Sequence, residues 1–182
     1  MYRIERQSNS FLFIGRLSEE KGIGCLLESF KATNLKLLMG GNGPLIDNVK
    51  TICTKYQNMQ YLGNLNKEQV QQYMQKCTAL IFPSIWYEGM PMTIIEAFSQ
   101  SLPVIANNLG AMSSMIKDGY NGLLFEAGNS SDLQAKLLEW QNKPQEEKEV
   151  FSKNAYQTYL DNYTPEKNLS QLLDIYNSVI QK

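Results

Sequence analysis

Two glutamates stand close together in the segment PSIWYEGMPMTIIEAF, residues 83–98. Glu88 lies in a turn rich in glycine and proline, whereas Glu96 lies in an apolar stretch that predicts a helix over 91–101, with Pro91 at its first position. Burying a carboxylate without a partner is costly, so Glu96 needs an internal salt bridge, a partly exposed helix face or a ligand. Vicinal hydroxyls of a ribose would suit Glu96, and Glu88 could then accept from the hydroxyls of a second sugar.

Two cations precede a predicted helix in the loop GRLSEEKG, residues 15–22. Arg16 and Lys21 lie where the free N–H groups and the dipole of a helix N-terminus already favour an anion. Together with the helix amides near 89–93, they would suit a diphosphate between two sugars. A solvated pair of surface cations explains the same pattern, so both interpretations stay open.

The glycine-rich turn GGNGPL, residues 40–45, is a poor match to the fingerprint of nicotinamide dinucleotide sites. Ile46 stands where the third glycine is required, and Tyr61 stands where an acidic residue would bind the ribose. A plain tight turn explains this segment at least as well as a ligand role.

Strands and helices alternate along most of the chain, and the strands are continuous apolar runs, which is typical of a parallel sheet covered on both faces. The pattern predicts an α/β fold: a Rossmann-like, doubly wound, six-stranded and mostly parallel sheet with helices on both faces and a helical C-terminus. Strands are expected over 11–15, 35–41, 59–63, 79–83, 102–107 and 121–125, and helices over 22–33, 44–56, 66–77, 91–101, 112–117, 130–142, 145–160 and 165–181. Asn66 is expected to cap the helix over 66–77. Ligands of such sheets bind outside the carboxyl ends of the strands, here the turns 15–22, 40–44, 63–66, 83–91 and 107–112.

The composition excludes several kinds of protein. The 182 residues carry a net charge of −1 and no histidine, so no Ser-His-Asp or Cys-His nucleophile can form within the chain and no general attraction to nucleic acid is expected. Three cysteines without a CxxC pair are typical of a reducing compartment. Because no signal peptide or apolar run of about 20 residues is present, we expect a cytoplasmic location and no direct membrane segment.

Five segments, in this order, carry a family resemblance: GRLSEEKG, GNGPL, YLGNL, PSIWYEGMPMTIIEA and DGYNGLLF. Together they resemble the retaining glycosyltransferases of group 1 (family 4), which have the GT-B fold, and the two glutamates match that family's E-x7-E motif. The resemblance covers about residues 11–128 and concerns the C-terminal half of such enzymes. It implies a tail or linker remnant over 1–10, a nucleotide-sugar (donor) binding domain over 11–163, and a helix over 164–182 that crosses to a missing N-terminal, acceptor-binding domain.

The resemblance also implies roles for individual residues. Arg16 and Lys21 would bind the donor diphosphate, Glu88 the hydroxyls of the donor sugar and Glu96 the ribose, with Arg16, Lys21 and Glu88 as the catalytic set. The remaining donor-binding residues lie in the turn after the first strand, beside the nucleobase and at the helix amides: Gly15; Gly63, Asn64 and Leu65; Gly89, Met90, Pro91, Met92 and Thr93.

Two positions depart from the family pattern. Met90-Pro91 stands where many relatives have Phe-Gly, which removes one backbone N–H from the amide cluster. Ser114 stands where the loop after the fifth strand commonly carries a glutamate, and no role is assigned to that loop.

The implied function is sugar transfer from a nucleotide diphosphate sugar to a hydroxyl acceptor, in the synthesis of cell-surface polysaccharide or glycan. No cofactor is implied, and because no D-x-D motif occurs, no metal is implied either. The expected partners are the donor and an N-terminal acceptor-binding domain or partner chain, through which the protein could reach the inner membrane surface. The chain alone would transfer little or nothing.

Other interpretations remain open. The chain could be an excised domain, a subunit of a split transferase, a non-catalytic nucleotide-sugar-binding module, a GT-B epimerase half or a nicotinamide-dependent domain.

Overall fold

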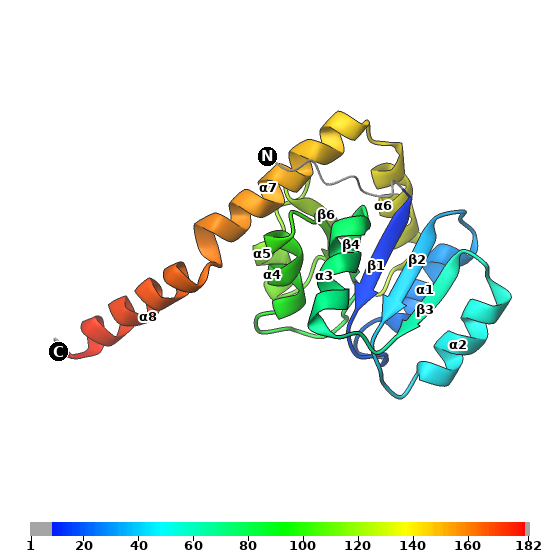
Figure 1. Ribbon diagram of the computed structural model, residues 1–182, viewed down its shortest axis with the longest axis horizontal. Coiled ribbons are helices and arrows are strands. Elements are labelled where there is room, and N and C mark those ends of the chain that lie inside the picture. Colours follow the sequence, from blue (N-terminus) through cyan, green and yellow to red (C-terminus); the bar gives the residue numbers. More distant parts are fainter. Residues whose placement is uncertain (1–8, 181–182) are drawn as a thin grey trace.

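Six short strands form one parallel sheet at the centre of the chain in the computed structural model, which describes residues 9–180 (Figure 1). The sheet order is β3-β2-β1-β4-β5-β6, and every strand pair is parallel. The strands are β1 (Ser10–Ile14), β2 (Lys36–Gly40), β3 (Met59–Gly63), β4 (Ala79–Phe82), β5 (Val104–Asn107) and β6 (Gly122–Phe125). The predicted doubly wound, six-stranded α/β architecture is confirmed.

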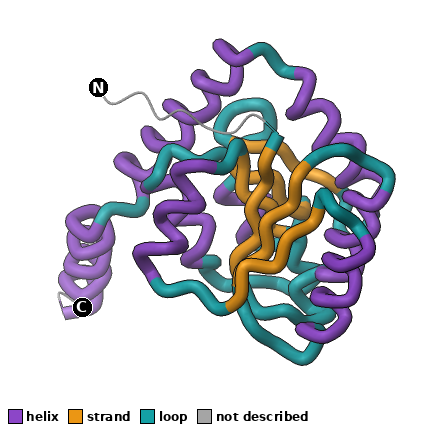
Figure 2. The backbone as a smooth tube through the Cα atoms, turned by 45° about the vertical axis from the view of Figure 1, so that its right-hand side comes forward, coloured by secondary structure: helices purple, strands orange, loops and turns teal. Residues whose placement is uncertain are grey.

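Helices cover both faces of the sheet (Figure 2). They are α1 (Ile23–Lys31), α2 (Ile46–Lys55), α3 (Lys67–Lys76), α4 (Met92–Ser99), α5 (Ala111–Met115), α6 (Ser130–Asn142), α7 (Gln145–Asn162) and α8 (Pro165–Ile180). Each lies within a few residues of a predicted helix. The predicted cap of α3 is confirmed, because the Asn66 side chain accepts from Gln69 N at 2.9 Å and the Gln69 side chain accepts from Asn66 N at 3.0 Å.

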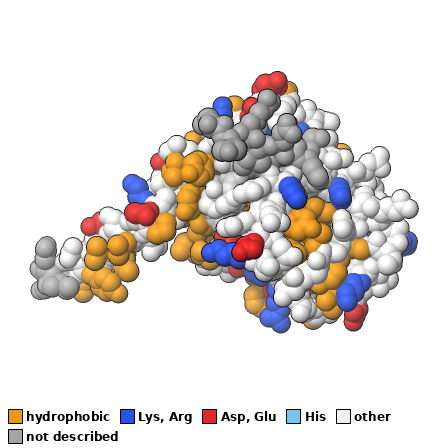
Figure 3. Space-filling view, in the orientation of Figure 1, with side chains coloured by type: hydrophobic (Ala, Val, Ile, Leu, Met, Phe, Trp, Pro, Cys, Tyr) orange, Lys and Arg blue, Asp and Glu red, His pale blue; other side chains and the backbone are white. Residues whose placement is uncertain are grey.

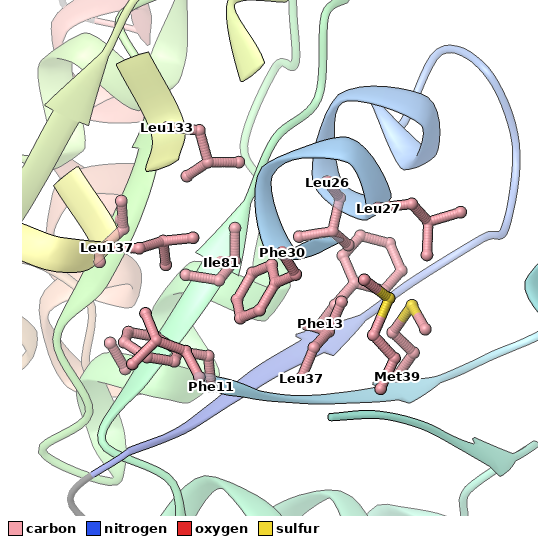
Figure 4. Close-up of a cluster of buried hydrophobic side chains, with 14 of the residues drawn as sticks. Phe11, Phe13, Leu26, Leu27, Phe30, Leu37, Met39, Ile81, Leu133 and Leu137 are labelled. Atoms are coloured by element: carbon pink, nitrogen blue, oxygen red, sulfur yellow. The ribbon is translucent and has the colours of Figure 1, made fainter. Parts of the chain in front are cut away.

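The apolar strands are buried on both faces because successive side chains point to opposite sides of a strand. Phe11 and Phe13 of β1 pack with α1 and α6 on one face, whereas Leu12 packs with α4 and α5 on the other. Figure 4 shows the first cluster, in which Ile81 of β4 lies between Phe30 of α1 and Leu137 of α6. These two cores hold the sheet rigid, so the loops at its carboxyl edge are presented from a fixed base.

Pro91 is not the first residue of α4, as the sequence predicted, but its N-cap. Its φ of −71° and ψ of 99° are extended, and the helix begins at Met92. A proline at this position still lacks an N–H, but Met92 and Thr93 keep theirs at the start of the helix.

The last helix, α8, projects away from the body of the molecule (Figure 1). Its apolar side chains are 43–67% exposed, and Figure 3 shows hydrophobic side chains on its surface: Leu169, Leu172, Leu173, Ile175, Tyr176 and Val179. The helix is amphipathic, and its apolar face is exposed in the part of the chain that the structure describes, whereas the apolar faces of the helices around the sheet are buried. Among residues 9–180, no helix is long and apolar enough to cross a membrane.

Candidate functional site

The strand order reverses between β1 and β4, because the chain runs outward from β1 to β3 and then returns to place β4 on the other side of β1. In doubly wound sheets, ligands bind at the carboxyl edge beside this point. Here the loops after β1 and β4 meet, since Ile85 N donates to Glu20 O at 3.0 Å and Ser84 Oγ lies 3.2 Å from the same oxygen. The topology therefore brings the loop that carries Arg16 and Lys21 into contact with the loop that carries Glu88.

A cavity of about 210 Å³ opens between these loops and the start of α4. Its walls include Lys21 from the loop after β1 and Glu88 from the loop after β4. The other predicted site residues in its lining are Gly15, Met90, Pro91, Met92 and Thr93.

A second cavity of about 240 Å³ adjoins the first and shares Ile14 and Gly15 with it. Besides Gly15, three more predicted residues line it, namely Arg16, Asn64 and Leu65. Gly41 lies beside them with φ 139°, and a Cβ at this glycine would lie 1.9 Å from Gly15 O, so the GGNGPL turn is built for close backbone approach. Gly63 ends β3 nearby and accepts from Gly41 N at 2.9 Å.

A third cavity of about 370 Å³ lies on the far side of the loop after β4. It shares Glu88 and Met90 with the first, and its lining also includes Gly89, Ser114 and Tyr163. Glu88 therefore stands between the first and third cavities.

Lys21 and Glu88, 67 residues apart, form an ion pair with Nζ 2.5 Å from Oε1. Ser84 Oγ lies 2.6 Å from the same carboxylate oxygen and donates to it. Burial on its own would raise the pKa of Glu88, but the hydrogen bonds from Lys21 and Ser84 and the charge of Lys21 outweigh it, so the pKa lies below its ordinary value. The site thus holds an ionised carboxylate next to a cation.

This lowered pKa predicts a pH-dependent stability. Ionised Glu88 stabilises the fold above its unfolded pKa, and the contribution is lost as the pH falls through the lower folded pKa. We expect Glu88→Gln to melt slightly below the wild type at about pH 7 and the two melting temperatures to converge in acid. Thermal unfolding of both proteins, from about pH 7 down to acid, measures the difference between their melting temperatures. The control is Glu28→Gln, which removes the exposed ion pair between Lys31 and Glu28. If the melting temperature of the wild type rose further above that of Glu88→Gln in acid, the lowered pKa of Glu88 would be wrong.

Two helix N-termini near the first cavity lack a capping side chain and an acidic residue in their first turn, those of α1 and α4. By contrast, α3 and α6 have both. The helix α1 begins directly after Lys21 and Gly22, and the first residues of α4, Met92 and Thr93, line the cavity. Free N–H groups beside a lysine suit an anion with several oxygens, such as a diphosphate.

Glu96 lies in α4, as predicted, and its surroundings decide between two of the alternatives that the sequence left open. It is exposed, because the buried face of α4 is formed by Ile94, Ile95, Ala97 and Phe98. Within the described residues it has no ion pair, so the alternative of an exposed helix face is correct and an internal salt bridge is wrong. Glu96 lies one helical turn beyond Met92, which lines the first cavity, but does not itself line that cavity or the second.

Two further residues of this site, Ser84 and Asn107, were not predicted from the sequence. Both are buried at the carboxyl edge of the sheet: Asn107 is the last residue of β5, and Ser84 lies two residues beyond the end of β4. A polar residue at the end of a buried strand is the signal that could have identified them.

Comparisons with known proteins identify the family of this chain. The model of the family "Glycosyl transferases group 1" matches residues 2–158. The chain is 34% identical over 137 residues to the uncharacterized glycosyltransferase MJ1178 of Methanocaldococcus jannaschii, covering 74% of this chain and 39% of that protein. It is 25% identical over 178 residues to the O-antigen chain mannosyltransferase C of Escherichia coli, covering 95% of this chain and 47% of that protein.

Solved structures share the fold. The structure of TarM superposes with a TM-score of 0.81 at 25% identity, over 95% of this chain and 36% of that one. That of Anabaena HepE, in complex with UDP and glucose, gives a TM-score of 0.82 at 20% identity, over 93% and 48%. The chain spans less than half the length of these relatives. Because the family model covers most of its residues, this chain belongs to the group 1 glycosyl transferases.

Proposed function

We propose that this chain is the donor-binding half of a retaining, family 4 glycosyltransferase of the GT-B type, which uses a nucleoside diphosphate sugar. The observation that carries this proposal is the convergence of Lys21, Glu88 and the uncapped start of α4 on one cavity at the switch point of the sheet. The HepE structure, which contains UDP and glucose, has the same fold and supports the choice of ligand class.

The three cavities suggest an order for the parts of the donor. The diphosphate would lie in the first cavity, against Lys21 and the amides of Met92 and Thr93. The nucleoside would extend into the second cavity, past Arg16 and along Asn64 and Leu65. The sugar would lie at Glu88, and the ribose hydroxyls would reach the exposed carboxylate of Glu96.

The chemistry requires the bond between the anomeric carbon and the β-phosphate oxygen to break while a bond to the acceptor oxygen forms. Negative charge grows on the departing diphosphate, where Arg16, Lys21 and the α4 amides would stabilise it. In a retaining reaction of the front-face kind, the acceptor's proton passes to the leaving phosphate oxygen. Glu88 then binds sugar hydroxyls rather than acting as a nucleophile, and trapping a glycosyl adduct on Glu88 would overturn this role. These cations would replace a metal ion.

The rest of the enzyme would lie in a second domain. The matched part of this chain covers only 39% and 47% of two relatives, and the exposed apolar face of α8 suits packing against an N-terminal acceptor domain. We therefore assign the chain from β1, which begins at Ser10 rather than at the predicted residue 11, to 163 as the donor-binding domain, and 164–182 as the crossing helix. Alone it would bind donor and transfer little. Names among the relatives, such as O-antigen chain mannosyltransferase and teichuronic acid biosynthesis glycosyltransferase, support a role in polysaccharide synthesis. We place this role in the cytoplasm, where the second domain could bring the chain to the inner membrane surface.

A thermal-shift panel of UDP, GDP, ADP and NAD tests the proposal. A nucleoside diphosphate at 100 times its Kd should stabilise the chain by about 2.7 kcal/mol, which raises the melting temperature by roughly 5–10 °C. Arg16→Ala and Glu96→Ala should each reduce this shift without changing the melting temperature of the free chain, because both side chains are exposed. A response to NAD alone would favour a nicotinamide-dependent domain. Sugar transfer after addition of an acceptor domain separates an enzyme from a binding module.

A further inference from the structure

We propose that Ser84 and Asn107 are positioning residues that hold the Glu88 carboxylate in place for the donor sugar, through hydrogen bonds that run from the end of β5 to the loop after β4. This inference deepens the proposed function and rests on it for the identity of the ligand. Neither residue is among the donor-binding residues that the family resemblance implies.

The first step is the contact of Asn107 with the backbone of the loop. Its side chain is fully buried, and Nδ2 donates to Pro83 O at 2.9 Å and to Ser84 O at 2.6 Å. The pairing of β4 with β5 ends at Phe82 and Ala106, so the amide group continues the connection just where the strand ladder stops. The two hydrogens on one amide nitrogen satisfy both carbonyls, which fixes the direction in which the chain leaves β4.

The second step passes from Ser84 to Glu88. Ser84 is 1% exposed, and its hydroxyl lies 2.6 Å from Glu88 Oε1 and 3.2 Å from Glu20 O. A hydroxyl carries one hydrogen, so we assign the donation to the shorter, charge-assisted contact with the carboxylate. Lys21 reaches the same oxygen, and the other charged group that faces Glu88 is Glu20. Both donors meet at Oε1, so Oε2 is the oxygen that can accept from a sugar hydroxyl.

The neighbours of Glu88 do not fix it by packing. Ile85, Trp86 and Tyr87 are 42%, 66% and 81% exposed, and Met90 is 54% exposed. A Cβ added at Gly89 would meet no atom within 4 Å. An exposed loop of this kind leaves a carboxylate free to rotate, and a weakly held group loses more conformational freedom when it binds. The bonds from Ser84 and Lys21 therefore determine where the carboxylate lies, and Asn107 determines where Ser84 lies.

The experiment compares Ser84→Ala with Ser29→Ala as a matched control. Ser29 is also 1% exposed and donates to a backbone carbonyl, Leu26 O, away from the site. Two readouts are measured: titration of the Glu88 carboxyl by carbon NMR, and calorimetric binding of UDP against UDP-glucose, with GDP against GDP-mannose as a second pair.

We expect Ser84→Ala to raise the pKa of Glu88, because a donor to the charged form is lost, while Ser29→Ala leaves it unchanged. Affinity for the nucleotide sugar should fall about tenfold, whereas affinity for the nucleotide alone should stay that of the wild type. An unchanged Glu88 titration, or equal losses for UDP and UDP-glucose, would overturn the inference. If neither nucleotide pair binds the wild type, the proposed function fails, but the titration still decides whether Ser84 holds the carboxylate.

Asn107→Ser removes the amide group that donates to both carbonyls and leaves a shorter side chain with a single hydrogen, so it tests the contact between Asn107 and the loop. We expect it to raise the pKa of Glu88 in the same direction as Ser84→Ala. The double variant should show less than the sum of the two changes, because both act through one chain of bonds. Additive changes would show that Asn107 acts independently of Ser84. If Asn107→Ser fails to fold, Ser84→Ala alone still tests the hold on Glu88.

Discussion

Replacing Lys21 by alanine is expected to lower the affinity for a nucleoside diphosphate sugar by about a hundredfold or more. The change removes the cation that faces the diphosphate in the first cavity, and it also leaves the Glu88 carboxylate without its ion-pair partner. The unpaired carboxylate then lies beside the diphosphate, so repulsion adds to the lost attraction. Calorimetric titration with UDP-glucose and GDP-mannose measures the loss.

Two further variants separate these effects. Lys21→Ala combined with Glu88→Gln should bind the nucleoside diphosphate, UDP or GDP, better than Lys21→Ala alone, because the repulsive charge is gone. Lys31→Ala is the matched control, since Lys31 forms an exposed ion pair with Glu28 at 2.6 Å on the far end of α1 and should not affect binding. If Lys21→Ala binds the donor as the wild type does, the diphosphate site is wrongly placed.

Gly22→Ala is expected to lower the free energy of unfolding by about 3 kcal/mol or more. Gly22 has φ 70°, which costs an alanine about 1–2 kcal/mol, and its new Cβ would lie 2.0 Å from Pro83 O. The loops after β1 and β4 would have to separate, because the atom in the way belongs to the backbone. Chemical denaturation measures the stability, and donor affinity should fall with it, because these two loops form the walls of the first cavity.

The same helix supplies the control for this substitution. Gly24 lies in α1, is exposed, and a Cβ there would meet no atom within 4 Å. Gly24→Ala should therefore stabilise the chain by about 0.5–1 kcal/mol, since alanine is the better helix former. A Gly22→Ala protein as stable as the wild type would show that the two loops are not held in close contact.

The amino-acid sequence by itself determined the fold class, the number of strands and the position of nearly every helix. The continuous apolar runs could only be buried on both faces, and local signals such as the Asn66 cap marked where helices begin. Because all carboxyl ends of a parallel sheet lie at one edge, the sequence also predicted that the loops carrying Lys21 and Glu88 would share that edge.

Only the tertiary structure decided which side chains meet there. The strand order places β1 beside β4, which brings Lys21 into contact with Glu88 although they are 67 residues apart in the sequence. It also places β5 beside β4, which brings Asn107 into contact with the loop that carries Ser84. It also set the rotation of α4, which turns Glu96 outward. Apolar periodicity predicts which face of each helix or strand is buried in the core. Contacts between distant loops depend instead on the strand order and on the rotation of short helices, and these are determined only when the whole sheet packs.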